Sequence, residues 1–152
     1  MNEPSADDTG VELPAVPQPQ GLYRTVVVYD GLAFTAGMTP RVDGRLTVQG
    51  LIGREVGIEA AGEAARLAAE NALAAIASAV GGLSRIAQCL RMTVYLACVD
   101  GFTEHSRIAD HASAVLGQMP GQRGSVARSA VGVASLPGGA PVEIELTVAV
   151  AQ

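Results

Sequence analysis

Two charged residues near the end of the chain, Arg128 and Glu143, have the types and spacing that could support chemistry. The strand predicted at residues 125–134 puts Arg128 on one face among small side chains, which leaves room for a ligand in front of the guanidinium. In the strand predicted at residues 142–150 every second side chain is apolar, so Glu143 and Glu145 point the other way. Both carboxylates are therefore predicted to lie outside the core.

The basic residues of the chain limit the chemistry further. All 10 are arginine, which excludes a lysine Schiff base and a Walker-type phosphate loop. Any reaction must therefore use arginine, carboxylates, hydroxyl groups and water. His105 and His111 do not share a face of their predicted helix, and no other ligands complete a set, so we expect no metal site.

The segment that joins the two strands, residues 136–141, contains the glycines and prolines of a sharp reversal. A simple hairpin there would place Glu143 opposite Ala134. Arg128 would then lie roughly 20 Å away, at ~3.4 Å per residue along the strand. If Arg128 and Glu143 share a site, two different chains must supply them.

The elements that position these residues follow from local patterns. Asp-Gly pairs at residues 30–31 and 43–44 predict two hairpins. Apolar residues every three or four positions predict a helix at residues 55–80, packed through alanine and ended by Gly81 and Gly82. Alternation predicts a strand at residues 85–99 with Leu90 on its apolar side, and Asp100 is the expected N-cap of a helix that ends near residue 118.

This order of elements predicts an α+β fold with one sheet covered by two helices on one face. The other face of the sheet is expected to be semi-polar and to be buried by a closed cyclic oligomer. The residues expected together on that face are Thr93, Tyr95, Arg128, Glu143 and Thr147.

The composition indicates one domain, residues 21–152, preceded by an acidic, proline-rich arm at residues 1–20. A net charge of -5 without a basic cluster argues against nucleic acid or a membrane as a partner. Cys89 and Cys98 are too far apart along one strand to form a disulfide, and no membrane-spanning or secretory segment is recognised. We therefore expect a cytoplasmic protein.

Several motifs resemble the Rid family, also called the YjgF or liver perchloric-acid-soluble protein family. The run ARSAVGVASLP at residues 127–137, followed by VEIE at residues 142–145, is similar to the C-terminal signature of that family. Residues 34–41 resemble its strand and G-x-x-P turn, and residues 63–73 resemble its first helix. The resemblance covers nearly all of residues 22–150.

The resemblance implies a chorismate-mutase-like homotrimer with sites between subunits, and a hydrolase that needs no metal or organic cofactor. Archetypal members convert enamines and imines of 2-amino acids to 2-keto acids and ammonia. Arg128 matches the arginine that binds the substrate carboxylate, and Glu143 matches the glutamate beside the attacking water. Tyr23 and Gly37 match other substrate-binding positions. Ala130 stands at a site position two residues after the arginine.

The chain departs from the archetypal deaminases at two positions of the site. Those enzymes carry a cysteine where this chain has Ala130, and a serine just before the site glycine where this chain has Ala36. These changes favour the main alternative, a noncatalytic trimer that binds a small 2-imino or 2-keto carboxylic acid or serves a pathway as an accessory protein. A ribonuclease or translation inhibitor, as some family members have been described, is disfavoured by the acidic charge and by the lack of a histidine pair.

Overall fold

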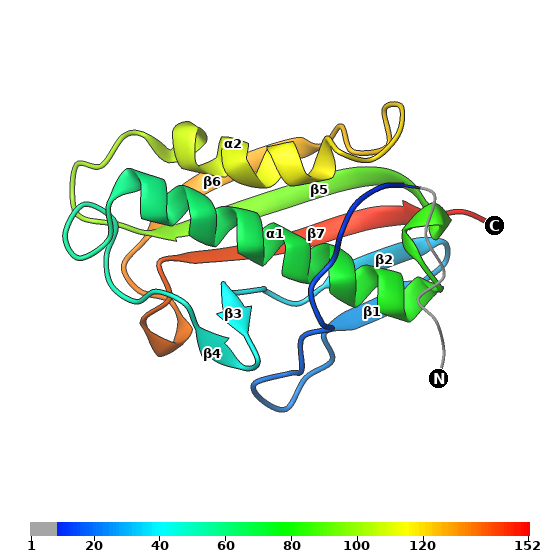
Figure 1. Ribbon diagram of the computed structural model, residues 1–152, viewed down its shortest axis with the longest axis horizontal. Helices are drawn as coiled ribbons and strands as arrows, with labels where there is room; N and C mark the ends of the chain where they lie inside the picture. The colour runs from blue at the N-terminus through cyan, green and yellow to red at the C-terminus, as the bar shows by residue number, and fades with distance from the viewer. Residues whose placement is uncertain (1–8) are drawn as a thin grey trace.

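The structure is a computed structural model, and it describes residues 9–152. Its main feature is a five-stranded sheet with helices on one face (Figure 1). The strands run in the order β1 (Val26–Tyr29), β2 (Leu32–Thr35), β7 (Val142–Val150), β5 (Ile86–Ala97) and β6 (Ala127–Val133). The helices are α1 (Ile58–Val80) and α2 (His105–Leu116), and a small ribbon consists of β3 (Arg41–Val42) and β4 (Arg45–Leu46). The expected α+β class is confirmed.

Both Asp-Gly pairs form the predicted hairpins. Asp30 and Gly31 have φ values of 49° and 76° between β1 and β2, and Asp43 and Gly44 have values of 50° and 78° between β3 and β4. Two consecutive residues with positive φ give the tight turn whose twist matches antiparallel strands. These two connections were therefore predictable from residue type alone.

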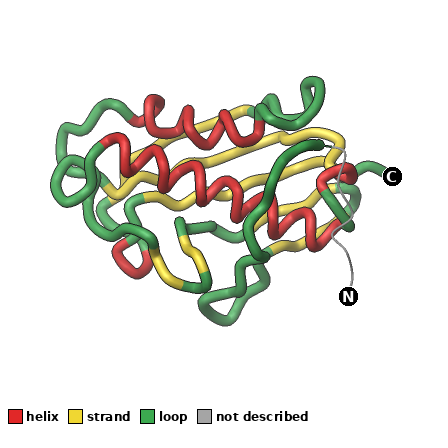
Figure 2. Tube along the Cα trace, in the orientation of Figure 1, coloured by secondary structure: helices red, strands yellow, loops and turns green. Residues whose placement is uncertain are grey.

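Helix α1 lies against the sheet beside α2, and together they form the layer that Figure 2 shows in red. Its inward face is alanine-rich, which lets the helix axis approach its neighbours closely. The helix ends as predicted: Gly81 has φ 97°, and its N–H and that of Gly82 both bond to the Ala77 carbonyl. The fully buried alanines of α1 are Ala61, Ala65, Ala68 and Ala72.

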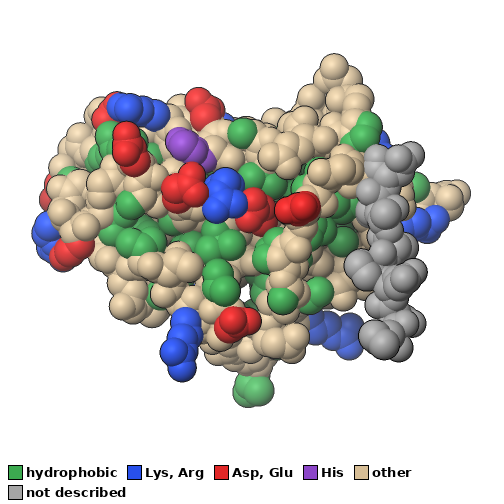
Figure 3. Space-filling view, in the orientation of Figure 1, with side chains coloured by type: hydrophobic (Ala, Val, Ile, Leu, Met, Phe, Trp, Pro, Cys, Tyr) green, Lys and Arg blue, Asp and Glu red, His purple; other side chains and the backbone are tan. Residues whose placement is uncertain are grey.

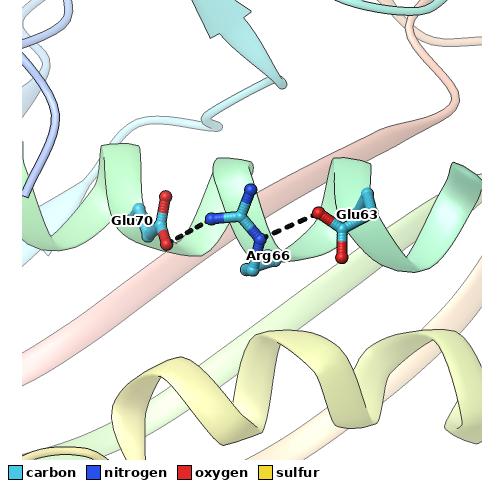
Figure 4. Close-up of polar contacts among 3 residues, drawn as sticks. All are labelled: Glu63, Arg66 and Glu70. Carbon is cyan, nitrogen blue, oxygen red and sulfur yellow. Dashed lines mark hydrogen bonds and ion pairs between the residues drawn. The ribbon is translucent and has the colours of Figure 1, made fainter.

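The outward face of α1 carries an ion-pair cluster. Arg66 lies between Glu63 and Glu70 and bonds to them at 3.1 Å and 2.5 Å (Figure 4). On this side of the molecule acidic and basic side chains are interspersed (Figure 3). The charges on this face therefore pair with one another along the helix.

The connection from β5 through α2 to β6 determines the strand order. It brings β6 beside β5 in parallel, while β7 pairs antiparallel with the other edge of β5. The predicted simple hairpin between the last two strands is therefore wrong, because β5 lies between them. Residues 134–141 instead cross one end of β5 and include the 3₁₀ turn Pro137–Gly139.

Two local predictions in this region also fail. A β-bulge between Cys89 and Arg91 shifts the alternation, so that Cys89 and Met92 are buried and Leu90 is exposed. Asp100 does not cap α2, because the helix begins at His105 and its N-cap residue is Glu104. The buried stripe of α2 is as expected, with Ile108, Ala112 and Val115 all in the core.

The described part of the predicted arm crosses α1 (Figure 1). Val11 and Leu13 pack against the same core as the sheet and helices. The acidic residues Glu3, Asp7 and Asp8 lie outside the described residues, and the domain boundary after residue 20 stays a prediction. Within residues 9–152, no helix is both long and apolar enough to cross a membrane.

Candidate active site

The site forms where the chain leaves β2 and meets β7. Met38 makes a two-way backbone bridge with Ile144, donating to its carbonyl at 2.7 Å and accepting from its N–H at 2.8 Å. This pairing places Gly37 directly against the side chain of Glu143, so that a Cβ at Gly37 would overlap the carboxylate. Only glycine fits at residue 37 while Glu143 keeps this position.

A pocket of about 280 Å³ opens beside this contact. It brings together Tyr23, Gly37 and Glu143, three of the residues that the sequence singled out. Its remaining lining residues are Gln20, Ala36, Thr39, Arg41 and Pro137. Apolar surface with a few polar groups of both charge signs is typical of a site for a small polar ligand.

The two carboxylates of β7 have different surroundings. Burial, followed by repulsion from Glu145, raises the pKa of Glu143. Glu145 accepts a hydrogen bond of 2.8 Å from the Tyr95 hydroxyl and does not line the pocket. That bond is the main cause of the raised pKa of Tyr95. The pocket therefore selects Glu143 as the group that can exchange a proton with a ligand or water.

Tyr23 and Gly37 supply further polar groups. The Gln20 N–H donates to the Tyr23 hydroxyl oxygen at 3.0 Å, so the phenol can still donate its own hydrogen to a ligand. The backbone N–H and C=O of Gly37 have no hydrogen-bond partner among the described residues. Both groups are therefore available to a small molecule in the pocket.

Arg128 lies elsewhere, and its expected place on the semi-polar face is wrong. It is opposite Met92 in the register of β6 with β5, and Met92 is buried beneath the helices. The Arg128 side chain accordingly faces α2, where Nη1 donates to Asp110 Oδ1 at 2.8 Å and to Ser113 Oγ at 2.9 Å. The other four residues expected on that face do lie on the side of the sheet away from the helices: Thr93, Tyr95, Glu143 and Thr147.

Ala130 shares the helix side of β6 with Arg128 and packs against the core. It does not line the pocket around Glu143. Ala36 does line it, so of the two alanine positions only this one removes a polar group from the pocket of a single chain. The pocket of a single chain therefore contains neither Arg128 nor Ala130.

The sequence did not single out Arg41 as a site residue. It follows the Gly37-x-x-Pro40 turn and begins the ribbon whose second strand starts after the Asp43–Gly44 turn. The position of Arg41 between two tight turns was the feature of the sequence that could have identified it, because such turns hold a side chain in a defined place. Within residues 9–152, no group of three or more His, Cys, Asp or Glu side chains could hold a metal ion.

The fold and the pocket define an α+β protein with a small polar site beside Glu143. Comparisons with known proteins identify its family. The family described as "YjgF/chorismate mutase-like, putative endoribonuclease" matches residues 5–140. The chain therefore belongs to the YjgF/chorismate mutase-like family, which confirms the resemblance found in the sequence.

Particular relatives extend over most of the chain. Protein TCP17 of Trypanosoma cruzi is 31% identical over 140 residues, which are 91% of this chain and 88% of that protein. A solved structure from Shewanella oneidensis, described as a "putative endoribonuclease", has a TM-score of 0.86 at 30% identity and covers 93% of both chains. Protein Atu1372 of Agrobacterium tumefaciens, described as of unknown function, has a TM-score of 0.83 at 34% identity, with 93% of this chain and 86% of that chain covered.

Proposed function

We propose that this protein hydrolyses imines or enamines of 2-amino acids to 2-keto acids and ammonia. The observation that carries the proposal is the position of Glu143: its carboxylate lines a small pocket, in contact with Gly37, and its pKa is raised mainly by burial. A carboxylate whose pKa lies closer to neutral pH is a better general base than an ordinary glutamate. No cofactor takes part in the proposed reaction.

In the proposed mechanism, Glu143 removes a proton from water as the water oxygen bonds to the carbon of the N-protonated imine, and the C=N π electrons move to nitrogen to give a neutral carbinolamine. Glu143 then returns that proton to the amino nitrogen, and the C–N bond breaks to release ammonia. The hydroxyl proton passes to Glu143 as the C=O bond forms, and from Glu143 to solvent. The Tyr23 hydroxyl, with its hydrogen free, donates to the substrate and orients it.

The proposal needs a second chain to bring Arg128 to this pocket, as a homotrimer would. The sheet face opposite the helices supports self-association, because the apolar side chains of Val27, Phe34 and Val131 are each more than 40% exposed there. A sheet face with such side chains is commonly covered by another layer. The mass of the particle in solution tests this directly, and a monomer would rule out a site shared between chains.

The experiment for the activity is release of ammonia and 2-keto acid from 2-iminobutanoate that a dehydratase generates in the same tube. The wild-type protein should accelerate release above the spontaneous rate, and Glu143→Gln should not. Glu145→Gln is the matched control, because it removes the same charge outside the pocket lining and leaves burial, the main cause of the raised pKa of Glu143, in place; it should keep most of the acceleration. Equal acceleration by all three proteins would contradict the proposal.

A noncatalytic carboxylate-binding protein is the second candidate, and Ala36 in the pocket is the observation that favours it. Without a hydroxyl at residue 36, the pocket has fewer groups to position water. This candidate predicts that 2-keto acids bind to the wild-type protein while ammonia release stays at the spontaneous rate.

A further inference from the structure

Arg41 is a cation that shares the pocket with Glu143 within one chain. Its guanidinium is held in place: Nε donates to Thr39 Oγ1 at 3.1 Å, and Nη1 donates to the Gly44 carbonyl at 2.8 Å. Both acceptors are neutral. Within residues 9–152, Arg41 forms no ion pair with a carboxylate, and its Nη2 has no hydrogen-bond partner.

The Nη2 atom of this guanidinium faces the turn Pro137–Gly139. A Cβ added to Gly138 would come within 3.1 Å of Arg41 Nη2, which places Nη2 against the turn Pro137–Gly139. Pro137 belongs to the lining of the pocket, as Arg41 does. The guanidinium and the turn that it faces therefore both border this pocket.

Arg66 and Arg128, which are partly buried like Arg41, have carboxylate partners: Arg66 pairs with Glu63 and Glu70, and Arg128 pairs with Asp110. Arg123 is also partly buried and has no carboxylate partner within residues 9–152, but it does not line the pocket around Glu143. A partly buried guanidinium that lacks such a partner has lost hydration without a compensating charge, and a bound carboxylate would supply that charge by bidentate hydrogen bonds.

We propose that Arg41 binds a second carboxylate of the substrate, so that the substrates are 2-imino acids with an acidic side chain. This inference rests on the proposed function, in which Arg128 of a neighbouring subunit binds the carboxylate next to the imine carbon. Two guanidinium groups then neutralise the two ends of a dicarboxylate. Because neither carboxylate needs Glu143 as a partner, Glu143 remains free to act on water. The product is a 2-keto dicarboxylate.

The test compares two probes that resemble products, 2-oxoglutarate as the dicarboxylate and 2-oxobutanoate as the monocarboxylate, by titration calorimetry. The wild-type protein should bind 2-oxoglutarate about tenfold more tightly or better, as expected for one additional charged hydrogen-bonded pair. This comparison needs no variant. Arg41→Gln should remove the preference, because it should weaken binding of 2-oxoglutarate much more than binding of 2-oxobutanoate, and Arg41→Lys should keep part of it.

Arg45→Gln is the matched control, because Arg45 is exposed on the same ribbon, outside the pocket lining. It should change neither affinity. Equal affinity of the wild-type protein for both probes, no binding of 2-oxoglutarate, or the same loss in Arg41→Gln and Arg45→Gln would each overturn the role of Arg41.

Ammonia release, measured in parallel, separates this inference from the proposed function. A preference for 2-oxoglutarate that depends on Arg41, without ammonia release from any imine, would leave the binding role standing and remove the deaminase. Ammonia release from 2-iminobutanoate, with no preference for the dicarboxylate, would support the deaminase and remove the binding role of Arg41.

Discussion

Arg128 and Glu143 project from opposite faces of one sheet. They are separated by two strand spacings and three residues along the strands, so their α carbons are about 14 Å apart. A small ligand held by Glu143 in the pocket of one chain cannot reach Arg128 of the same chain. Any site that uses both residues must therefore combine two chains.

This arrangement predicts complementation between two inactive variants. Arg128→Ala and Glu143→Gln should each lose turnover, but subunits mixed by unfolding and refolding together should recover it. In a randomly mixed cyclic trimer, roughly a quarter of the interfaces would carry both wild-type residues, so about a quarter of wild-type activity is expected. Activity assays on the mixture and on each variant refolded alone provide the measurement. No recovery in a mixture that forms mixed oligomers would contradict a shared site.

Glu143→Gln should lower turnover by about 10² to 10⁴, the usual contribution of a general base. The same substitution should change the pH dependence of stability. Because the pKa of Glu143 is raised in the folded protein, its contribution to stability is present below about pH 4.3 and is lost as the pH rises through the raised value. The free energy of unfolding of the variant, relative to that of the wild type, should therefore be higher at pH 8 than at pH 4. Urea denaturation at both pH values measures this gain, and a constant difference would contradict it.

Gly37→Ala should destabilise the protein by about 1–3 kcal/mol, because the new Cβ would occupy the position of the Glu143 carboxylate. The effect should disappear largely in the double variant Gly37→Ala, Glu143→Ala, in which the overlapping group is gone. A double-mutant cycle by chemical denaturation measures the coupling. Additive costs would show that the clash is relieved in another way.

In the folded protein at pH 8, Cys89 should be unreactive toward Ellman's reagent and Cys98 should react slowly. Burial raises the pKa of Cys89 to about 12, which leaves about one thiolate in ten thousand at that pH. Burial, followed by the charge of Asp100, also raises the pKa of Cys98, but this thiol is only partly buried and should react first. Unfolding in guanidinium chloride should release both thiols. Rapid reaction of Cys89 before unfolding would contradict its buried position.

Features that depend only on residues adjacent in the chain were determined by the sequence alone. The Asp-Gly turns, the alanine face of α1 and its end at Gly81 follow from backbone geometry and helical periodicity, and each is found where it was predicted. The motifs around Arg128 and Glu143 identified the family without any knowledge of contacts. Alternation also grouped Arg128 correctly with Ala130 on one face of its strand.

Only the tertiary structure decided which strands are neighbours and which face the helices cover. Alternation gives two faces but does not say which one is buried, and Arg128 was assigned to the wrong one for this reason. The bulge in β5 interrupts the alternation itself and exposes Leu90. The contact of Gly37 with Glu143 depends on the pairing of Met38 with Ile144, two residues far apart in the chain. Such pairings arise from packing of the whole domain, so the pocket and the place of Arg41 in it became visible only in the folded protein.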